Sequence, residues 1–219
     1  TKVKESGELV KSPGQLVLSG YCTMPDITKV VTPDIKRPGE SRLIFIDLAN
    51  GKKRLGGSAL AQVYGQIGDE CPDVEDPGLL KRAFNAIQEL IDKDLILAGH
   101  DVSDGGLIVT LLEMAFAGNC GLQTCVPISE IDDENLAVIP AFFAEEAGVV
   151  IEYLTEDEEE IISIIRDKNG VGVQRIGETL SKSSTPWIII GGWPFGGTIV
   201  FQEDMRELRQ LWEETSYQR

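Results

Sequence analysis

The sequence predicts a layered α+β domain with a largely antiparallel or mixed sheet. Strand-like and helix-like segments follow one another irregularly, a pattern typical of a mixed or largely antiparallel sheet. Hydrophobic residues make up 42% of the 219 positions, which is enough to build a substantial core. We assign residues 15–219 to this domain, and residues 1–14, polar around a Ser-Pro-Gly break, to a linker or the tail of a preceding domain.

Strands are predicted where apolar and β-branched residues alternate between turn residues. The clearest strand is residues 42–49, in which Ile44, Ile46 and Leu48 alternate. Residues 187–192 and 197–202 are predicted to form a hairpin, and the glycine-rich turn between them is interpreted as structural. The other predicted strands are residues 15–22, 95–101, 120–128, 147–154 and 171–178.

The first main helix is predicted over residues 77–92. Asp76 is its N-cap and Pro77 its first residue, an order that favours helix initiation. Apolar residues at helical spacing predict one buried face. These residues are Leu80, Phe84, Ile87 and Ile91.

A second main helix, residues 105–117, is apolar on nearly all sides, so we expect it to be sandwiched. Both main helices should pack on the same sheet. Shorter helices are predicted from Ser58, over 156–167 with Thr155 and Glu158 as a capping box, and over 203–215. The last helix carries Met205, Leu208 and Trp212 on one face.

The net charge of −16 is concentrated in one window. No lysine or arginine lies between Lys93 and Arg166, whereas sixteen acidic residues do. Such a field repels a phosphate backbone, so nucleic acid is excluded as a partner, while Mg²⁺ or a basic neighbouring domain is favoured. We interpret the acidic run 156–160 as a solvated helix face.

Other protein classes are excluded by simple patterns. No apolar run approaches the roughly 20 residues of a membrane span, so no membrane partner is expected. The first residues lack the apolar centre of a signal peptide, and no methionine starts the chain, so we expect a piece of a longer polypeptide. The four cysteines form no C-x-x-C pair and are expected to be reduced, mostly buried thiols in a cytoplasmic protein.

The stretch GHDVSDGGLIVTLLEMAFAGN, residues 99–119, holds the main candidate site. A strand leads into it and a helix leaves it, so unpaired N–H groups and Gly105 and Gly106 could receive a phosphate. A carboxylate just before the glycines could hold Mg²⁺, and Ser103 could bond a phosphate or the metal shell. The alternative is a plain turn in which Ser103 or Asp104 caps the helix.

Other candidates carry weaker signals. Residues 54–58, Arg-Leu-Gly-Gly-Ser, also lead into a helix and could cradle a phosphate, although a glycine turn is an equally good explanation. Glu145 and Glu146 could face a cleft, but no partner residue is evident. The single histidine, His100, supports no serine–histidine–aspartate set, so we assign no catalytic residue.

Five segments resemble the phosphoribosylformylglycinamidine synthase family in the same order. HDVSDGGL is the most specific, and the match runs over nearly all of the chain. The resemblance is to the large, single-chain form, and within it to the C-terminal domain of the second half of the synthetase core. The segments are SPGQLVLSGY at 12–21, DITKVVTPDI at 26–35, RLGGSALAQVYGQIG at 54–68, HDVSDGGL at 100–107 and AFFAEEAGVVIE at 142–152.

The resemblance implies a domain of an ATP- and glutamine-dependent ligase of purine biosynthesis, which converts formylglycinamide ribonucleotide to formylglycinamidine ribonucleotide. The implied fold is the α/β/α layered fold, with a mixed sheet and helices, of the C-terminal domain of aminoimidazole ribonucleotide synthetase. The implied partners are the preceding synthetase domains and the glutaminase domain of the same chain, together with small-molecule substrates. Without those domains the chain is expected to be inactive.

The resemblance also implies an auxiliary site for Mg²⁺ and ATP or ADP. By motif position Asp101 is the metal ligand and Ser103 a nucleotide contact, beside Gly105 and Gly106. Two alternatives stay open: a non-catalytic structural or interaction domain, and a related ATP-dependent enzyme such as aminoimidazole ribonucleotide synthetase or selenophosphate synthetase. The order of the five segments favours a domain of phosphoribosylformylglycinamidine synthase over aminoimidazole ribonucleotide synthetase or selenophosphate synthetase.

Overall fold

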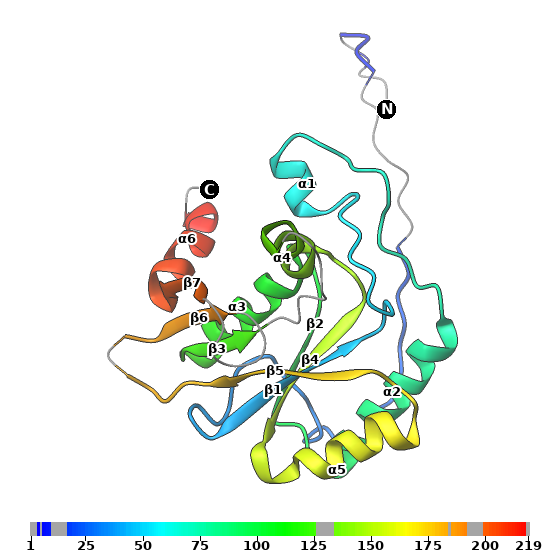
Figure 1. Ribbon diagram of the computed structural model, residues 1–219. Helices are drawn as coiled ribbons and strands as arrows, with labels where there is room; N and C mark the ends of the chain where they lie inside the picture. The colour runs from blue at the N-terminus through cyan, green and yellow to red at the C-terminus, as the bar shows by residue number, and fades with distance from the viewer. Residues whose placement is uncertain are drawn as a thin grey trace.

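The computed structural model describes residues 4, 6–9, 17–125, 134–183, 185–191 and 199–217. Within these ranges, seven strands form one sheet in the order β2-β4-β1-β5-β3-β6-β7 (Figure 1). The strands are β1 (Ser41–Asp47), β2 (Ala98–Asp101), β3 (Leu122–Cys125), β4 (Gly148–Leu154), β5 (Val173–Thr179), β6 (Trp187–Gly191) and β7 (Ile199–Asp204).

The sheet is mixed, as predicted. Neighbouring strands run antiparallel except β3 and β6, which are parallel. β1 lies centrally between β4 and β5, and its register places Ile44 opposite Ile151. Among the described strands β2 pairs with β4, where Asp101 lies opposite Val149, so β2 is an edge strand.

Helices cover both faces of this sheet, which confirms the α/β/α layering (Figure 1). On one face α3, α4 and α6 pack over a core that includes Met114, Leu122 and Ile176. On the other face α2, α5 and η2 pack over Ile44, Ile46 and Tyr153. The helical segments are α1 (Ala59–Val63), α2 (Pro77–Asp92), α3 (Gly106–Gly118), α4 (Glu134–Phe143), η1 (Thr155–Asp157), α5 (Glu158–Ile162), η2 (Ser163–Lys168) and α6 (Met205–Tyr217).

Helix α2 has the predicted start but a different buried face. Asp76 accepts the N–H of Leu79 at 2.9 Å and Pro77 is the first residue. Leu80 and Phe84, predicted to be buried, are 42% and 59% exposed. The buried residues of α2 are instead Leu79, Ala83, Ala86 and Leu90, which belong to the same core cluster as Ile44, Ile46 and Tyr153.

The predicted strand 15–22 is wrong over the described residues 17–22. These residues have no regular structure, and Val17, Leu18 and Tyr21 are more than four-fifths exposed. In Figure 1 the N-terminal segment runs away from the body of the domain, so it has no sheet edge to pair with. A strand needs neighbours, and an apolar pattern alone does not supply them.

Other predictions are resolved locally. The hairpin strands are confirmed as β6 and β7, but the turn at 192–198 and residues 126–128 of the predicted strand 120–128 lie outside the described residues. Helix α4, which contains Pro140, was not predicted. The capping box is wrong, because Glu158 bonds Arg42 and the Tyr153 hydroxyl instead of the backbone at Thr155.

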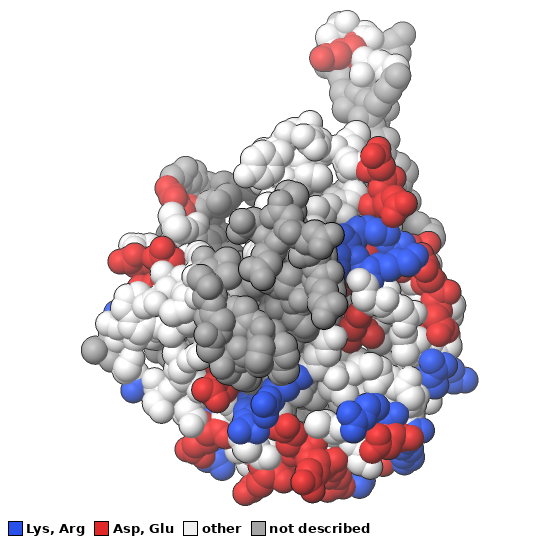
Figure 2. All heavy atoms as spheres, viewed as in Figure 1, with Lys and Arg blue, Asp and Glu red and all other residues white. Residues whose placement is uncertain are grey.

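The acidic face is therefore only partly solvated. Glu158 is half-buried, whereas Glu159 and Glu160 are exposed. Figure 2 shows acidic and basic side chains intermixed along the lower edge of this face, where α2 and α5 lie in Figure 1. Lys93 pairs there with Glu160, and Lys168 with Glu89. None of the helices in the described ranges is long and apolar enough to cross a lipid bilayer.

Candidate functional site

The candidate site is the turn between β2 and α3. Asp101 is the last residue of β2, and its side chain is 80% exposed. Ser103 follows in the turn, half-buried, and its hydroxyl has no hydrogen-bond partner among the described residues. Asp104 is exposed in the same turn. The two oxygen-bearing side chains assigned to ligands, Asp101 and Ser103, are thus both available in one short turn.

Gly105 and Gly106 are required by the backbone of this turn. Both have positive φ, +90° and +79°, which disfavours any side chain. A Cβ on Gly106 would lie 2.5 Å from the carbonyl oxygen of Phe142, so the glycine also lets α3 start directly against the end of α4. Close packing of α3 on α4 therefore accounts for this glycine before any ligand is considered.

The helix start is capped by a residue that the sequence analysis left without a role. Gly105 is the N-cap of α3 and neither Ser103 nor Asp104 caps it, so the plain-cap interpretation is wrong. Instead Glu145 Oε1 accepts the Gly105 N–H at 2.8 Å. The Gly106 N–H is used by the Ser103 carbonyl at 3.0 Å.

Glu145 also joins this turn to the second glycine turn. The same Oε1 atom accepts the Ala59 N–H at 2.8 Å, at the start of α1. Ser58 is the N-cap of α1, as the predicted helix start requires. The structure therefore brings together the two turns that the sequence flagged separately, and a carboxylate of the chain itself occupies the position between them.

Glu146 is the buried partner of Arg54. Arg54 Nε and Nη2 donate to the two carboxylate oxygens at 2.7 and 2.8 Å, and the Arg54 N–H donates to Oε1 at 3.0 Å. Burial acts to raise the pKa of Glu146, but the donors from Arg54 outweigh it and hold that pKa below its usual range. The same hydrogen bonds raise the pKa of Arg54. A buried carboxylate requires such a partner. No sequence signal identified the pair, because Arg54 and Glu146 lie 92 positions apart.

The oxygen-bearing side chains in the turn between β2 and α3 supply only part of a Mg²⁺ coordination shell. Mg²⁺ takes oxygen ligands, and the exposed Asp101 carboxylate is one. Across the described ranges, no group of three or more His, Cys, Asp or Glu side chains is arranged to hold a metal ion. Any metal at Asp101 therefore needs further ligands from a nucleotide, water or another domain.

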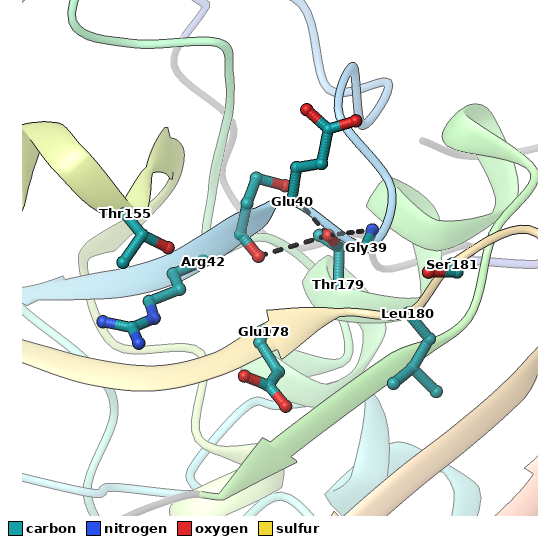
Figure 3. A pocket seen from close by; sticks show the side chains of 9 residues that line it. Gly39, Glu40, Arg42, Thr155, Glu178, Thr179, Leu180 and Ser181 are labelled. Carbon is teal, nitrogen blue, oxygen red and sulfur yellow. Dashed lines mark hydrogen bonds between the residues drawn. The ribbon is translucent and has the colours of Figure 1, made fainter.

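A separate pocket of about 290 Å³ lies at the other end of β4 (Figure 3). Arg42 on β1 and Glu178 on β5 are cross-strand neighbours in its wall, beside Thr155 and Thr179. Arg42 already pairs with Glu158 at 2.7 Å, so its charge is not available to a ligand. The residues that line the pocket include none of the site residues predicted from the sequence.

The cysteines divide into two pairs rather than being mostly buried. Cys22 and Cys71 are exposed, and Cys120 and Cys125 are buried. Burial raises the pKa of the Cys120 thiol to about 12, which removes it as a nucleophile at neutral pH.

The family whose sequence model matches this chain is described as AIR synthase related protein, C-terminal domain. The match covers residues 42–186. It therefore runs from β1 to the residue before β6 and includes both glycine turns, Asp101 and Glu145.

Curated relatives match over nearly the whole chain. Human phosphoribosylformylglycinamidine synthase is 44% identical over 212 residues, which cover 96% of this chain and 15% of the relative. An Arabidopsis thaliana protein named probable phosphoribosylformylglycinamidine synthase, chloroplastic/mitochondrial, is 44% identical over 213 residues, which cover 97% of this chain and 14% of that relative. The chain thus spans about 15% of the length of such relatives.

Solved structures share the fold. Thermotoga maritima PurL complexed with FGAR superposes with a TM-score of 0.63 at 17% identity, covering 83% of this chain and 30% of that one. Thermotoga maritima PurL complexed with ATP superposes with a TM-score of 0.59 at 17% identity, covering 83% of this chain and 27% of that one. At this identity the likeness establishes architecture, and it agrees with the layered fold predicted from the sequence.

Proposed function

Because this chain belongs to the AIR synthase related protein family, matching its C-terminal domain, we propose that it is a domain of a phosphoribosylformylglycinamidine synthase. Within the large, single-chain form it is the C-terminal domain of the second half of the synthetase core, with residues 1–14 as a linker or the tail of the preceding domain. The observation that carries this proposal is 44% identity to the human enzyme over 96% of the chain.

The activity proposed for the whole protein is ATP-dependent C–N ligation with glutamine as the nitrogen donor. It converts formylglycinamide ribonucleotide to formylglycinamidine ribonucleotide, and this domain supplies no catalytic residue. The partners are the other synthetase domains and the glutaminase domain of the same chain, and nucleic acid and membranes are not partners. A cytoplasmic location belongs to the proposal too, although the plant relative is named chloroplastic/mitochondrial.

The contribution of this domain is one edge of an auxiliary nucleotide site. Asp101 would supply a carboxylate oxygen to Mg²⁺, and the Ser103 hydroxyl would contact ATP or ADP. Mg²⁺ bound there would neutralise phosphate charge and so hold the nucleotide. Two observations support this assignment: the Asp101 carboxylate is exposed, and the Ser103 hydroxyl has no hydrogen-bond partner within the described parts of the chain.

Gly105 and Gly106 would form the floor of the same site. The Gly105 N–H is held by Glu145, so a phosphate that used it would have to displace that carboxylate. Gly106 would contribute because it has no side chain, which allows the turn to pack closely against the end of α4. A ligand contact at Ser103 needs neither amide.

The test is an assay of the full-length polypeptide and of the 219-residue chain. The full-length protein should form formylglycinamidine ribonucleotide only when ATP, glutamine and Mg²⁺ are all present. The chain alone should neither hydrolyse ATP nor deamidate glutamine, because the partner domains are missing. A full-length protein without this activity, or turnover by the 219-residue chain, would contradict the proposal.

A second candidate is a structural domain without a ligand at this turn. It is favoured by Glu145, whose carboxylate already satisfies the amides of both glycine turns. In that case Asp101 is a surface residue, and its replacement leaves nucleotide content unchanged. The two candidates therefore differ in the result of a single substitution.

A further inference from the structure

Helix α3 carries two polar side chains among thirteen residues, and both reach the end of β2. They are Thr110 and Glu113, three residues apart and therefore on one side of the helix. Thr110 Oγ1 donates to the Asp101 carbonyl oxygen at 3.2 Å, and Glu113 Oε2 lies 3.2 Å from His100 Nε2. The proposed function assigns no role to either residue.

His100 links the two contacts. Its Nδ1 atom donates to the Asp101 carbonyl oxygen at 2.7 Å and lies 3.3 Å from the carboxylate oxygen Oδ1 of the same residue. The imidazole side chain is only 18% exposed. Contacts at both ring nitrogens fix its orientation between α3 and Asp101.

The main chain at Asp101 is held by hydrogen bonds, while its carboxylate stays exposed with one oxygen 3.3 Å from His100 Nδ1. The Asp101 carbonyl accepts two side-chain donors, and the next N–H, that of Val102, donates to the Gly148 carbonyl at 2.9 Å. The Asp101 carboxylate nevertheless remains 80% exposed. Metal ligands are typically oriented by hydrogen bonds of this kind from residues that do not touch the metal.

We propose that His100, Thr110 and Glu113 are positioning residues that hold Asp101 in place for a Mg²⁺ ion. This inference rests on the proposed function, because it requires a metal at Asp101. Thr110 is fully buried, and a buried polar group is costly without a partner, whereas the Glu113 side chain is 26% exposed. The Thr110 hydroxyl also reaches the Gly106 carbonyl at 3.3 Å, so the contacts of the two side chains lie at the end of β2 and at the start of α3.

The test uses the full-length protein with its bound nucleotide. The readout is the half-time of nucleotide release after EDTA is added, together with the Mn²⁺ electron paramagnetic resonance signal of the Mn²⁺-loaded protein. The variants are Thr110→Val, Glu113→Gln and His100→Gln, with Asp101→Asn as the reference. Thr110→Ser should restore the hydroxyl and the slow release.

Thr124→Val is the matched control for Thr110→Val. Thr124 is also buried, but its hydroxyl is the buried side-chain polar atom left without a hydrogen bond among the described residues. Both substitutions exchange the same groups in the core of the domain, and only one removes a contact to Asp101. Melting temperatures of all variants separate loss of fold from loss of positioning.

We expect release to be about tenfold faster in Thr110→Val, Glu113→Gln and His100→Gln, with Thr124→Val unchanged, in line with the usual effect of losing such supporting contacts. Fast release in Asp101→Asn with wild-type release in all three positioning variants would overturn this inference and leave the proposed site intact. Wild-type release in Asp101→Asn as well would overturn both. Equal acceleration in Thr124→Val would assign the effect to general destabilisation and overturn the inference alone.

Discussion

The carboxylate of Glu145 accepts the backbone N–H of Gly105 at 2.8 Å, and the same oxygen accepts the N–H of Ala59. One side chain thus ties the starts of α1 and α3 to each other. Carboxylates stabilise helix starts because the first N–H groups are unpaired and carry partial positive charge. The polar organisation of this end of the domain depends on that single residue.

Replacing Glu145 by alanine should destabilise the domain. Two backbone N–H groups lose their acceptor, and we expect a loss of roughly 1–3 kcal/mol in the free energy of unfolding. Urea denaturation of the 219-residue chain measures it. Glu203→Ala, at an exposed position on β7, is the control and should be nearly neutral. Equal stability of the two variants would mean that the Glu145 contacts contribute nothing.

The Arg54–Glu146 pair should make stability depend on pH. Its donors hold the pKa of Glu146 below the ordinary value, so the ionised pair stabilises the fold above that value. This contribution is lost as the pH falls through the lowered pKa of the folded state. Glu146→Gln should therefore cost about 3 kcal/mol near pH 7 and progressively less below about pH 4.5. Denaturant titrations at both pH values measure the difference, and a cost independent of pH would contradict the assignment.

Gly106→Ala should be more damaging than other glycine substitutions. Its added Cβ meets the Phe142 carbonyl at 2.5 Å and also requires a positive φ. Gly51 has the same φ of +79° with open space around it, so Gly51→Ala isolates the backbone cost, about 1 kcal/mol. Gly172→Ala, with neither problem, should be neutral. We expect Gly106→Ala to lose roughly 2–4 kcal/mol by thermal and urea unfolding, since overpacking adds to strain.

The four thiols should react in two classes. Cys22 and Cys71 are exposed, while burial raises the pKa values of Cys120 and Cys125. A disulfide reagent such as DTNB should therefore modify two thiols rapidly in the native chain and all four in denaturant. Rapid modification of Cys120 in the native chain would contradict the packing of α3 on β3.

The fold class was predictable because it depends on local patterns repeated along the chain. Asp76 and Pro77 mark the start of α2 by chemistry that acts within one turn. The buried face of α2 was wrong because alanines face the sheet, whereas larger apolar residues such as Phe84 lie outside. Strand 15–22 was wrong because pairing depends on neighbours that a sequence pattern does not contain.

The sequence predicted the position of the candidate site in a turn, but it did not predict the hydrogen bonds that surround that turn. The motif around Asp101 and Ser103 identified the strand-to-helix junction correctly. Glu145 was named from the sequence, but its partners appeared only in three dimensions, since they lie 40 and 86 positions away in the sequence. The contacts of Thr110 and Glu113 with β2 were hidden in the same way by an almost wholly apolar helix.

The most direct measurement of the central claim compares nucleotide content in two full-length variants, Asp101→Asn and Asp104→Asn. Both remove one exposed carboxylate from the same turn, and only Asp101 is assigned to Mg²⁺. The account predicts that nucleotide released by denaturation falls in Asp101→Asn, and that its melting temperature falls too, because a ligand bound only to the folded state is lost. Asp104→Asn should match the wild type in both. Equal nucleotide content and equal melting temperatures in wild type and Asp101→Asn would contradict the account.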